Sequence, residues 1–309
     1  MVFLTPQLIG IDVTATEIRV ARIDRKNGTW RLAEGGASSL SQGVLKPSFK
    51  NLNVVDEDRF TSAIREAVES LSTKVSTAGL SLPSEIVKTM IQKYPELPDS
   101  TAETERLIGW GMERSFHFPI QSAKISYQRL GDDTDGMKRL LITIGMADVI
   151  RQYETLFKQV GIETRVIRPA GINLYNVFSE HFPKEGTVAF MGLFETYFNF
   201  IVFDNGELSF FHGVKRGFSD LQFFQDVDMT LKHYLDSNPG KQIRQIRVGS
   251  QVGYHHELKE VLNNLIDMEV TILNEGGVIL SDYDLSKPLD RLELSSFVSA
   301  IGAAMSLAH

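Results

Sequence analysis

The sequence contains the same strand, turn and strand twice, about half a chain apart. In the first copy a buried type of strand ends at Asp12, and a turn of small polar residues leads into a strand at 18–23. In the second copy the strands lie at 187–192 and 198–203. Such a repeat predicts two similar lobes that face each other across a cleft. The copies differ where chemistry is expected, because we align Asp12 with Phe190.

The segments between the two copies predict a mixed α/β protein with a small inserted unit. A strand at 30–37 ends in a glycine turn, a helix spans 60–71, and a short buried strand spans 75–82. A proline-punctuated loop, a helix, a hairpin and a second helix then form a small α+β insert over 84–166. The small residues of the last helix, at 295–307, predict tight packing on a sheet.

Composition limits the function classes. A length of 309 residues allows two domains, and the 42% hydrophobic and 23% charged content is typical of a soluble globular protein. The net charge of −7 argues against nucleic acid as the main partner. Cysteine is absent, which excludes disulfides, a thiol nucleophile and a cysteine metal site. Since there is no signal peptide and no run of about 20 apolar residues, we expect a cytoplasmic protein without membrane insertion.

Asp12 is the strongest single candidate for chemistry. A carboxylate at the end of a buried strand, beside a turn rich in amides and hydroxyls, can hold a hydrated Mg²⁺ ion near a phosphate. The competing interpretation is an aspartate that accepts hydrogen bonds from its own turn. From the sequence alone we favour this second interpretation.

Two further segments contain residue types that chemistry could use. The segment 249–253, between a strand and a helix, can let a nucleotide approach the backbone. It matches neither the phosphate-binding loop nor the dinucleotide glycine pattern nor a nucleophile elbow, so an ordinary turn is favoured. His255 and His256 lie beside Glu257 and Glu260, but a metal would need further ligands, and exposed histidines at a helix start are favoured.

The order of several segments carries a resemblance over nearly the whole chain. These segments are 9–12 with 18–20, 107–110, 118–119, 125–128, 148–161, Gly192 with Thr196, 248–250 and 297–302. In this order they resemble the PilM family of type IV pilus assembly proteins, including MshI-type relatives. These are actin-like proteins akin to FtsA, and the cytoplasmic domain of the type II secretion protein GspL is a more distant relation.

The resemblance implies an α/β, actin-like (ribonuclease H-like) two-lobed fold with an inserted small α+β subdomain called 1C. The implied division has the first lobe at 1–83, the 1C-like insert at 84–166 and a return to the first lobe at 167–186. The second lobe follows at 187–294, and a C-terminal helix at 295–309 packs on the first lobe.

The resemblance also implies a nucleotide site, and this chain departs from it in three places. The family's first hairpin usually reads Asp-x-Gly, but Thr14 adds a side chain where a phosphate approaches the backbone. The second hairpin lacks its aspartate, and Ser250 replaces one glycine of the adenosine loop. The doubtful site comprises Asp12, Thr14, Thr16, Gly192, Thr196, Gly249 and Ser250. We expect no working ATPase, no catalytic residue and no metal site, and ATP with Mg²⁺ is the one cofactor left open.

The function that the resemblance implies is a scaffold of a pilus or type II secretion assembly platform. Such a protein captures the N-terminal cytoplasmic segment of a PilN-like inner-membrane protein, as an extended peptide or short helix. We expect the groove between the first lobe and the insert, further contacts with other platform proteins, and a peripheral location at the inner membrane through the partner. Two alternatives stay open: an active actin-like or sugar-kinase-like ATPase that uses Asp12, and a filament-forming cytoskeletal protein.

Overall fold

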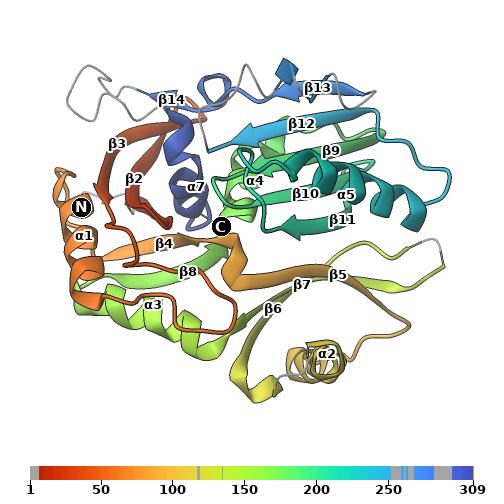
Figure 1. Cartoon of the computed structure of the whole chain (residues 1–309), viewed down its shortest axis with the longest axis horizontal. Coiled ribbons are helices and arrows are strands. Elements are labelled where there is room, and N and C mark those ends of the chain that lie inside the picture. Colours follow the sequence, from red (N-terminus) through yellow and green to blue (C-terminus); the bar gives the residue numbers. More distant parts are fainter. Residues whose placement is uncertain are drawn as a thin grey trace.

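The structure is a computed structural model that describes residues 7–116, 119–133, 135–251, 259–260, 262–263, 268–281 and 294–308. Its strands form two large sheets and one small one, with helices packed against them (Figure 1). Among the described residues, no helix is both long and apolar enough to cross a membrane. His255, His256 and most of the helix expected after them lie outside the described residues.

The two large sheets repeat one strand order. The first sheet has the order β14-β3-β2-β1-β4-β8, with β1 (Leu8–Val13), β2 (Glu17–Lys26), β3 (Thr29–Ser39), β4 (Thr77–Leu82), β8 (Glu163–Pro169) and β14 (Leu280–Ser281). The second has the order β11-β10-β9-β12-β13, with β9 (Thr187–Leu193), β10 (Phe198–Asp204), β11 (Glu207–Val214), β12 (Gln245–Ser250) and β13 (Glu269–Ile272). Apart from β14, which pairs parallel with β3 at one edge of the first sheet, each sheet consists of an antiparallel meander of three strands followed by two parallel strands. The predicted pair of similar lobes is therefore confirmed.

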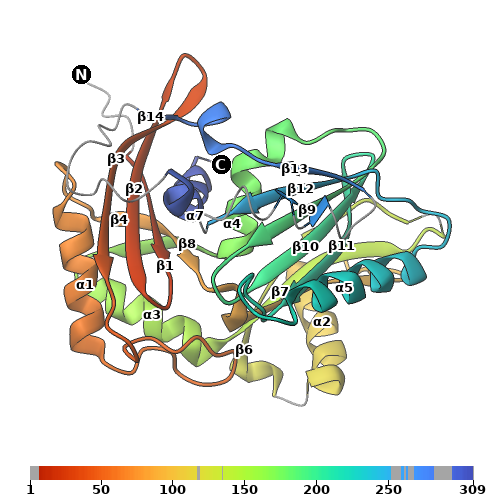
Figure 2. The same cartoon turned by 45° about the horizontal axis from the view of Figure 1, so that its top comes forward.

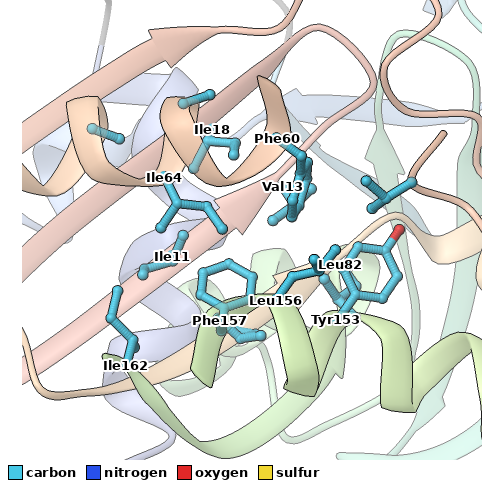
Figure 3. Packing of buried hydrophobic residues seen from close by; sticks show 14 of the residues in the cluster. Ile11, Val13, Ile18, Phe60, Ile64, Leu82, Tyr153, Leu156, Phe157 and Ile162 are labelled. Carbon is cyan, nitrogen blue, oxygen red and sulfur yellow. The ribbon is translucent and has the colours of Figure 1, made fainter. Parts of the chain in front are cut away.

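Helices cover both faces of the first sheet. The helices are α1 (Glu57–Glu69), α2 (Thr101–Phe116), α3 (Ala147–Gln159), α4 (Ala170–Phe178), α5 (Phe223–Ser237) and α7 (Leu294–Met305), with short 3₁₀ turns at η1 (Ser84–Ile86), η2 (Ile120–Ser122), η3 (Ser179–His181) and η4 (Glu275–Gly277). On one face α1 and α3 bury their apolar stripes against β1 (Figure 3). There Phe60 meets Tyr153 and Phe157 edge to face, with ring centroids 6.2 and 6.3 Å apart.

On the other face, α7 lies between the two lobes and touches their backbones directly (Figure 2). A Cβ atom at Gly10 of β1 would lie 2.9 Å from the carbonyl carbon of Ala300 and 2.5 Å from the backbone nitrogen of Ala304. A Cβ at Gly302 would lie 2.6 Å from the carbonyl carbon of Asn173 in α4. Only glycine allows these approaches, so the predicted tight packing of the last helix on a sheet is confirmed.

The third sheet, with the order β5-β7-β6, forms the insert. Its strands are β5 (Val87–Tyr94), β6 (Ala123–Arg129) and β7 (Lys138–Met146). Helix α2 buries Ile108 and Met112 against β7, while Trp110 on its outer side is 67% exposed. The Ser100 hydroxyl caps α2, since it accepts a hydrogen bond from the backbone N–H of Glu103 at 3.2 Å.

Three boundaries differ from those in the sequence analysis. Helix α3 packs in the core of the first lobe and β8 completes its sheet, so the insert proper spans about 87–146 rather than 84–166. The glycine turn expected at the end of the segment 30–37 is wrong, because β3 continues through it to Ser39. A Cβ at Gly36 would lie 2.6 Å from the carbonyl oxygen of Ala67, so this glycine admits the end of α1. Strand β12 likewise continues through Ser250.

Candidate functional site

The turns of the two hairpins meet at one cavity between the lobes. It has a volume of about 70 Å³. Its walls come mainly from both hairpin turns, from η1 and the residue before it, and from the end of β12. They are residues 12–16, Arg19, Pro47, 83–85, Ala170, 194–196 and Gln251. Of the predicted site residues, the structure brings Asp12, Thr14, Thr16 and Thr196 together here, and it places the other three away from the cavity.

Asp12 is fully buried near the end of β1, and side chains rather than solvent surround it. Its register neighbours are Arg19 on β2 and Ser81 on β4. The amide nitrogen of Gln251 donates a hydrogen bond to Asp12 Oδ2, and a guanidinium nitrogen of Arg19 lies 3.8 Å from the same oxygen. Arg19 in turn pairs with Glu17 at 2.7 Å. This carboxylate therefore accepts a hydrogen bond from Gln251 in the second lobe and forms an ion pair with Arg19 of its own lobe.

Burial raises the pKa of the Asp12 carboxyl above its usual value, and the surrounding groups only partly oppose this. Arg19 lowers the pKa most, Ser81 and Gln251 lower it through their side chains, and Glu17 raises it. The Ser81 hydroxyl is close enough to act on the charge, although neither it nor Asp12 Oδ1 makes a hydrogen bond of ordinary geometry within the described residues. A carboxylate in this state is poorly suited to compete for a hydrated metal ion.

In the first hairpin turn, backbone N–H groups donate hydrogen bonds to the side-chain hydroxyl of Thr14. Thr14 Oγ1 accepts hydrogen bonds from the backbone N–H groups of Glu17, at 2.9 Å, and Thr16, at 3.4 Å. Backbone N–H groups of a turn are the donors that a phosphate needs. The side chain that replaces the family's glycine therefore takes up these donors, in the manner of a Ser/Thr turn.

The second hairpin turn contacts η1, just before the insert. Thr196 Oγ1 donates a hydrogen bond of 2.6 Å to a carboxylate oxygen of Glu85 in η1. Burial, and secondarily the charge of Glu85, raise the pKa of the neighbouring Tyr197. Together with the bond between Asp12 and Gln251, this gives two hydrogen-bonded bridges across the interlobe cavity.

The register of the hairpins corrects one alignment. Both turns have four residues and are closed by the same backbone hydrogen bond of 2.9 Å, from the first turn residue to the carbonyl of the fourth. Counted from these turns, Asp12 aligns with Gly192, and Phe190 aligns with Gly10. The alignment of Asp12 with Phe190 is thus wrong by two residues. Phe190 is instead a buried core residue whose ring centroid lies 5.6 Å from that of Tyr175.

Gly192 has a packing partner rather than a ligand. The buried Asn199, its register partner on β10, places its amide oxygen directly over Gly192, where a Cβ would collide with it. The same oxygen would lie 2.6 Å from a Cβ at Gly171, at the start of α4. The pair of Gly192 and Asn199 thus corresponds to the pair of Asp12 and Arg19 in the first lobe. The Asn199 side chain occupies the space beside Gly192 that the Asp12 side chain occupies there.

Gly249 and Ser250 lie inside β12 and do not line the cavity. A Cβ at Gly249 would come within 3.1 Å of the Phe190 ring, so this glycine makes room for an aromatic side chain. Ser250 is buried and pairs in register with Leu193.

Sequence reasoning missed Arg19, Gln251 and Glu85. A signal existed for Arg19, because a four-residue turn after Val13 places residue 19 opposite Asp12.

This interlobe cavity does not fit a nucleotide with its metal ion. Ligand pockets have volumes of about 300–1,000 Å³, several times the 70 Å³ found here. Among the described residues, no group of three or more histidines, aspartates and glutamates could hold a metal ion. The arrangement can hold the two lobes together, through the hydrogen bonds of Gln251 with Asp12 and of Thr196 with Glu85.

A second, larger cavity lies between the first lobe and the insert. It is a groove of about 270 Å³, bounded by β8, α3 and the start of β5 on one side and by β6 and β7 on the other. Strand β8 is the edge of the first sheet and β6 is the edge of the third. Its lining is Leu82, Ile86, Val87, Lys124, Ile125, Ser126, Thr143, Gly145, Ile150, Glu154, Thr164, Arg165, Ile167, Arg168 and Pro169.

Comparisons with known proteins identify the fold through solved structures alone. No protein-family model matches the chain, and no curated protein does. A solved PilM-PilN type IV pilus biogenesis complex contains a chain that matches with a TM-score of 0.83 at 11% identity, over 98% of this chain and 99% of that one.

Two other solved structures match less closely. The cytoplasmic domain of EpsL, an inner-membrane component of the type II secretion system of Vibrio cholerae, matches with a TM-score of 0.54 at 8% identity, covering 98% and 96% of the two chains. A Bacteroides thetaiotaomicron protein of actin-like ATPase fold and unknown function matches with 0.53 at 11% identity, covering 87% and 91%. The chain therefore has the actin-like fold, and its predicted resemblance to PilM is confirmed at the level of structure.

Proposed function

We propose that this protein is a scaffold of a type IV pilus or type II secretion assembly platform. In this role it captures the N-terminal cytoplasmic segment of a PilN-like inner-membrane protein. The observation that carries the proposal is the groove between β6 and β8, in a chain whose shape follows one chain of a PilM-PilN complex over nearly its whole length. The protein then works in the cytoplasm and reaches the inner membrane, and the other platform proteins, through its partner.

The two strand edges favour an extended peptide over a helix. An edge strand presents N–H and C=O groups that no neighbouring strand pairs, and an added peptide strand can bond to them. Between the two edges lie apolar side chains that can receive alternate side chains of such a peptide. These are Leu82, Ile86, Val87, Ile125, Ile150, Ile167 and Pro169.

The interlobe cavity supports a scaffold rather than a nucleotide-driven machine. Its volume, the Thr14 hydroxyl on the turn amides and the Arg19 charge beside Asp12 all oppose binding of a triphosphate. A degenerate nucleotide site thus belongs to the proposal. An ATPase that uses Asp12 is not favoured, because Gln251 and Arg19 already bind that carboxylate.

Binding of labelled PilN-like N-terminal peptides, measured by fluorescence anisotropy, tests this function. We expect micromolar affinity for the wild type. Ser126→Trp should weaken binding at least about tenfold, because Ser126 is an exposed residue of β6 in the groove and an indole ring would fill it. Ser237→Trp, at an exposed position of the second lobe, is the matched control and should bind like the wild type. If no peptide binds at micromolar concentration, the proposed function is wrong.

A further inference from the structure

The charged side chains of the groove between β6 and β8 are not balanced. Three are cationic and one is anionic. Lys124 of β6 and Glu154 of α3 neutralise each other, with Nζ 2.8 and 2.9 Å from the two carboxylate oxygens. Arg165 and Arg168 of β8 remain, and within the described part of the chain neither has a hydrogen bond or an ion pair.

Arg168 is unusual among the partly buried arginines of this protein. Arg22 pairs with Glu34 at 2.6 Å, and Arg216 reaches Asp226 at 2.7 Å. Arg168 is half-buried without such a partner, and burial lowers its pKa. A cation that has lost water without gaining an acceptor is destabilising. Its position is explained if the missing acceptor belongs to a ligand.

Both arginines of β8 line the groove. In the pairing with β4, Ala78 faces Thr164 and Gly79 faces Val166, so Arg165 is an extra residue. Such a β-bulge shifts the alternation of side chains and re-aims them. Residues three apart in sequence, which point to opposite faces of a regular strand, can therefore line the same cavity.

The chemistry of the missing acceptor follows from the arginine side chain. A guanidinium presents a planar fork of N–H donors that matches the two oxygens of a carboxylate. The chain as a whole carries a charge of −7, so an excess of cations in this groove is a local feature and not a general basic field. Apolar lining beside the two arginines fits a segment that combines apolar residues with an acidic one.

We propose that the groove selects an extended partner segment by an aspartate or glutamate side chain whose carboxylate pairs with Arg168. Arg165, which is more exposed, adds attraction at the mouth of the groove. This inference rests on the proposed function, and it names a residue of this chain that sets partner specificity.

A displayed library of random N-terminal peptides, selected on the full chain, tests the inference. On the wild type we expect enrichment of aspartate or glutamate at one position. A selected peptide should bind about 10-fold to 100-fold more tightly than its copy with the acid replaced by the amide. On Arg168→Gln that difference should fall below about twofold. The matched control is Arg65→Gln, an exposed arginine of α1 outside the groove, which should retain the full difference.

The outcomes separate the two proposals. If no peptide is enriched, the peptide-capture function fails, and this inference fails with it. If peptides are enriched without an acid, or if Arg168→Gln keeps the preference for the acid, only the inference is wrong. Thermal unfolding gives a further readout: removal of an unpaired half-buried charge should leave the melting temperature equal or higher, whereas loss of a structural arginine should lower it.

Discussion

Replacement of Gly10 by alanine should separate the last helix from the first sheet. The new Cβ would lie 2.5 Å from the Ala304 nitrogen and 2.9 Å from the Ala300 carbonyl carbon, and both are backbone atoms that no rotamer change can move. Ordinary contacts of a Cβ atom begin at 3.4 Å. Helix α7 must therefore move away from β1 by about 1 Å.

The magnitude follows from what α7 buries. Its large buried side chains are Phe297, Val298, Ile301 and Met305. Each is worth about 1.5–3 kcal/mol when buried, or roughly 6–12 kcal/mol together. A gap of 0.5–1 Å loses about a quarter to a half of the contact energy. We therefore expect Gly10→Ala to lower the free energy of unfolding by about 1.5–6 kcal/mol, with ~3 kcal/mol as the central value.

Urea unfolding followed by the fluorescence of Trp30 measures this effect in the first lobe. Trp30 is buried in the cluster that α7 completes, and Trp110→Phe, at an exposed position, makes it the single tryptophan. Gly111→Ala in α2 is the matched control: nothing lies within 4 Å of its Cβ, so it should stabilise the protein by about 0.5–1 kcal/mol. A loss below about 1 kcal/mol for Gly10→Ala would refute the reasoning.

Two further predictions concern the interlobe cavity. Because burial raises the pKa of Asp12, its carboxyl loses its proton at a lower pH in the unfolded chain than in the folded protein. The contribution of this group to the free energy of unfolding therefore falls as the pH rises above 3.8, which is the pKa of the unfolded chain. Asp12→Asn should therefore melt at a higher temperature than the wild type at pH 7, with a difference that shrinks towards pH 4; a lower melting temperature at pH 7 would contradict this. Thr14→Gly frees the turn amides but leaves Arg19 and the small volume. Neither the wild type nor Thr14→Gly should then bind a fluorescent ATP analogue with Mg²⁺ at about 1 mM, and saturable binding by the wild type would be the opposite result.

The sequence predicted the two hairpins and the lobes well, because alternating apolar residues and turn residues are local signals. The sequence did not predict how the strands of one hairpin align with those of the other. The alignment of Asp12 with Phe190 followed the family's motif, whereas the strand pairing aligns Asp12 with Gly192. Nor could local patterns show that Gln251, 239 residues away in sequence, would donate to Asp12. Such contacts depend on how the two lobes pack against each other, and no single sequence segment predicts that packing.

The last helix also affects how the chain folds during synthesis. Helix α7 covers β1, yet it begins about 280 residues after β1 ends. At about 5–20 residues per second, the ribosome needs roughly 15–60 s to supply it. During that time the face of the first sheet at Gly10 lacks the helix that packs directly against it. A nascent first lobe thus stays open on this face until α7 has left the ribosome, and docking of α7 closes its core.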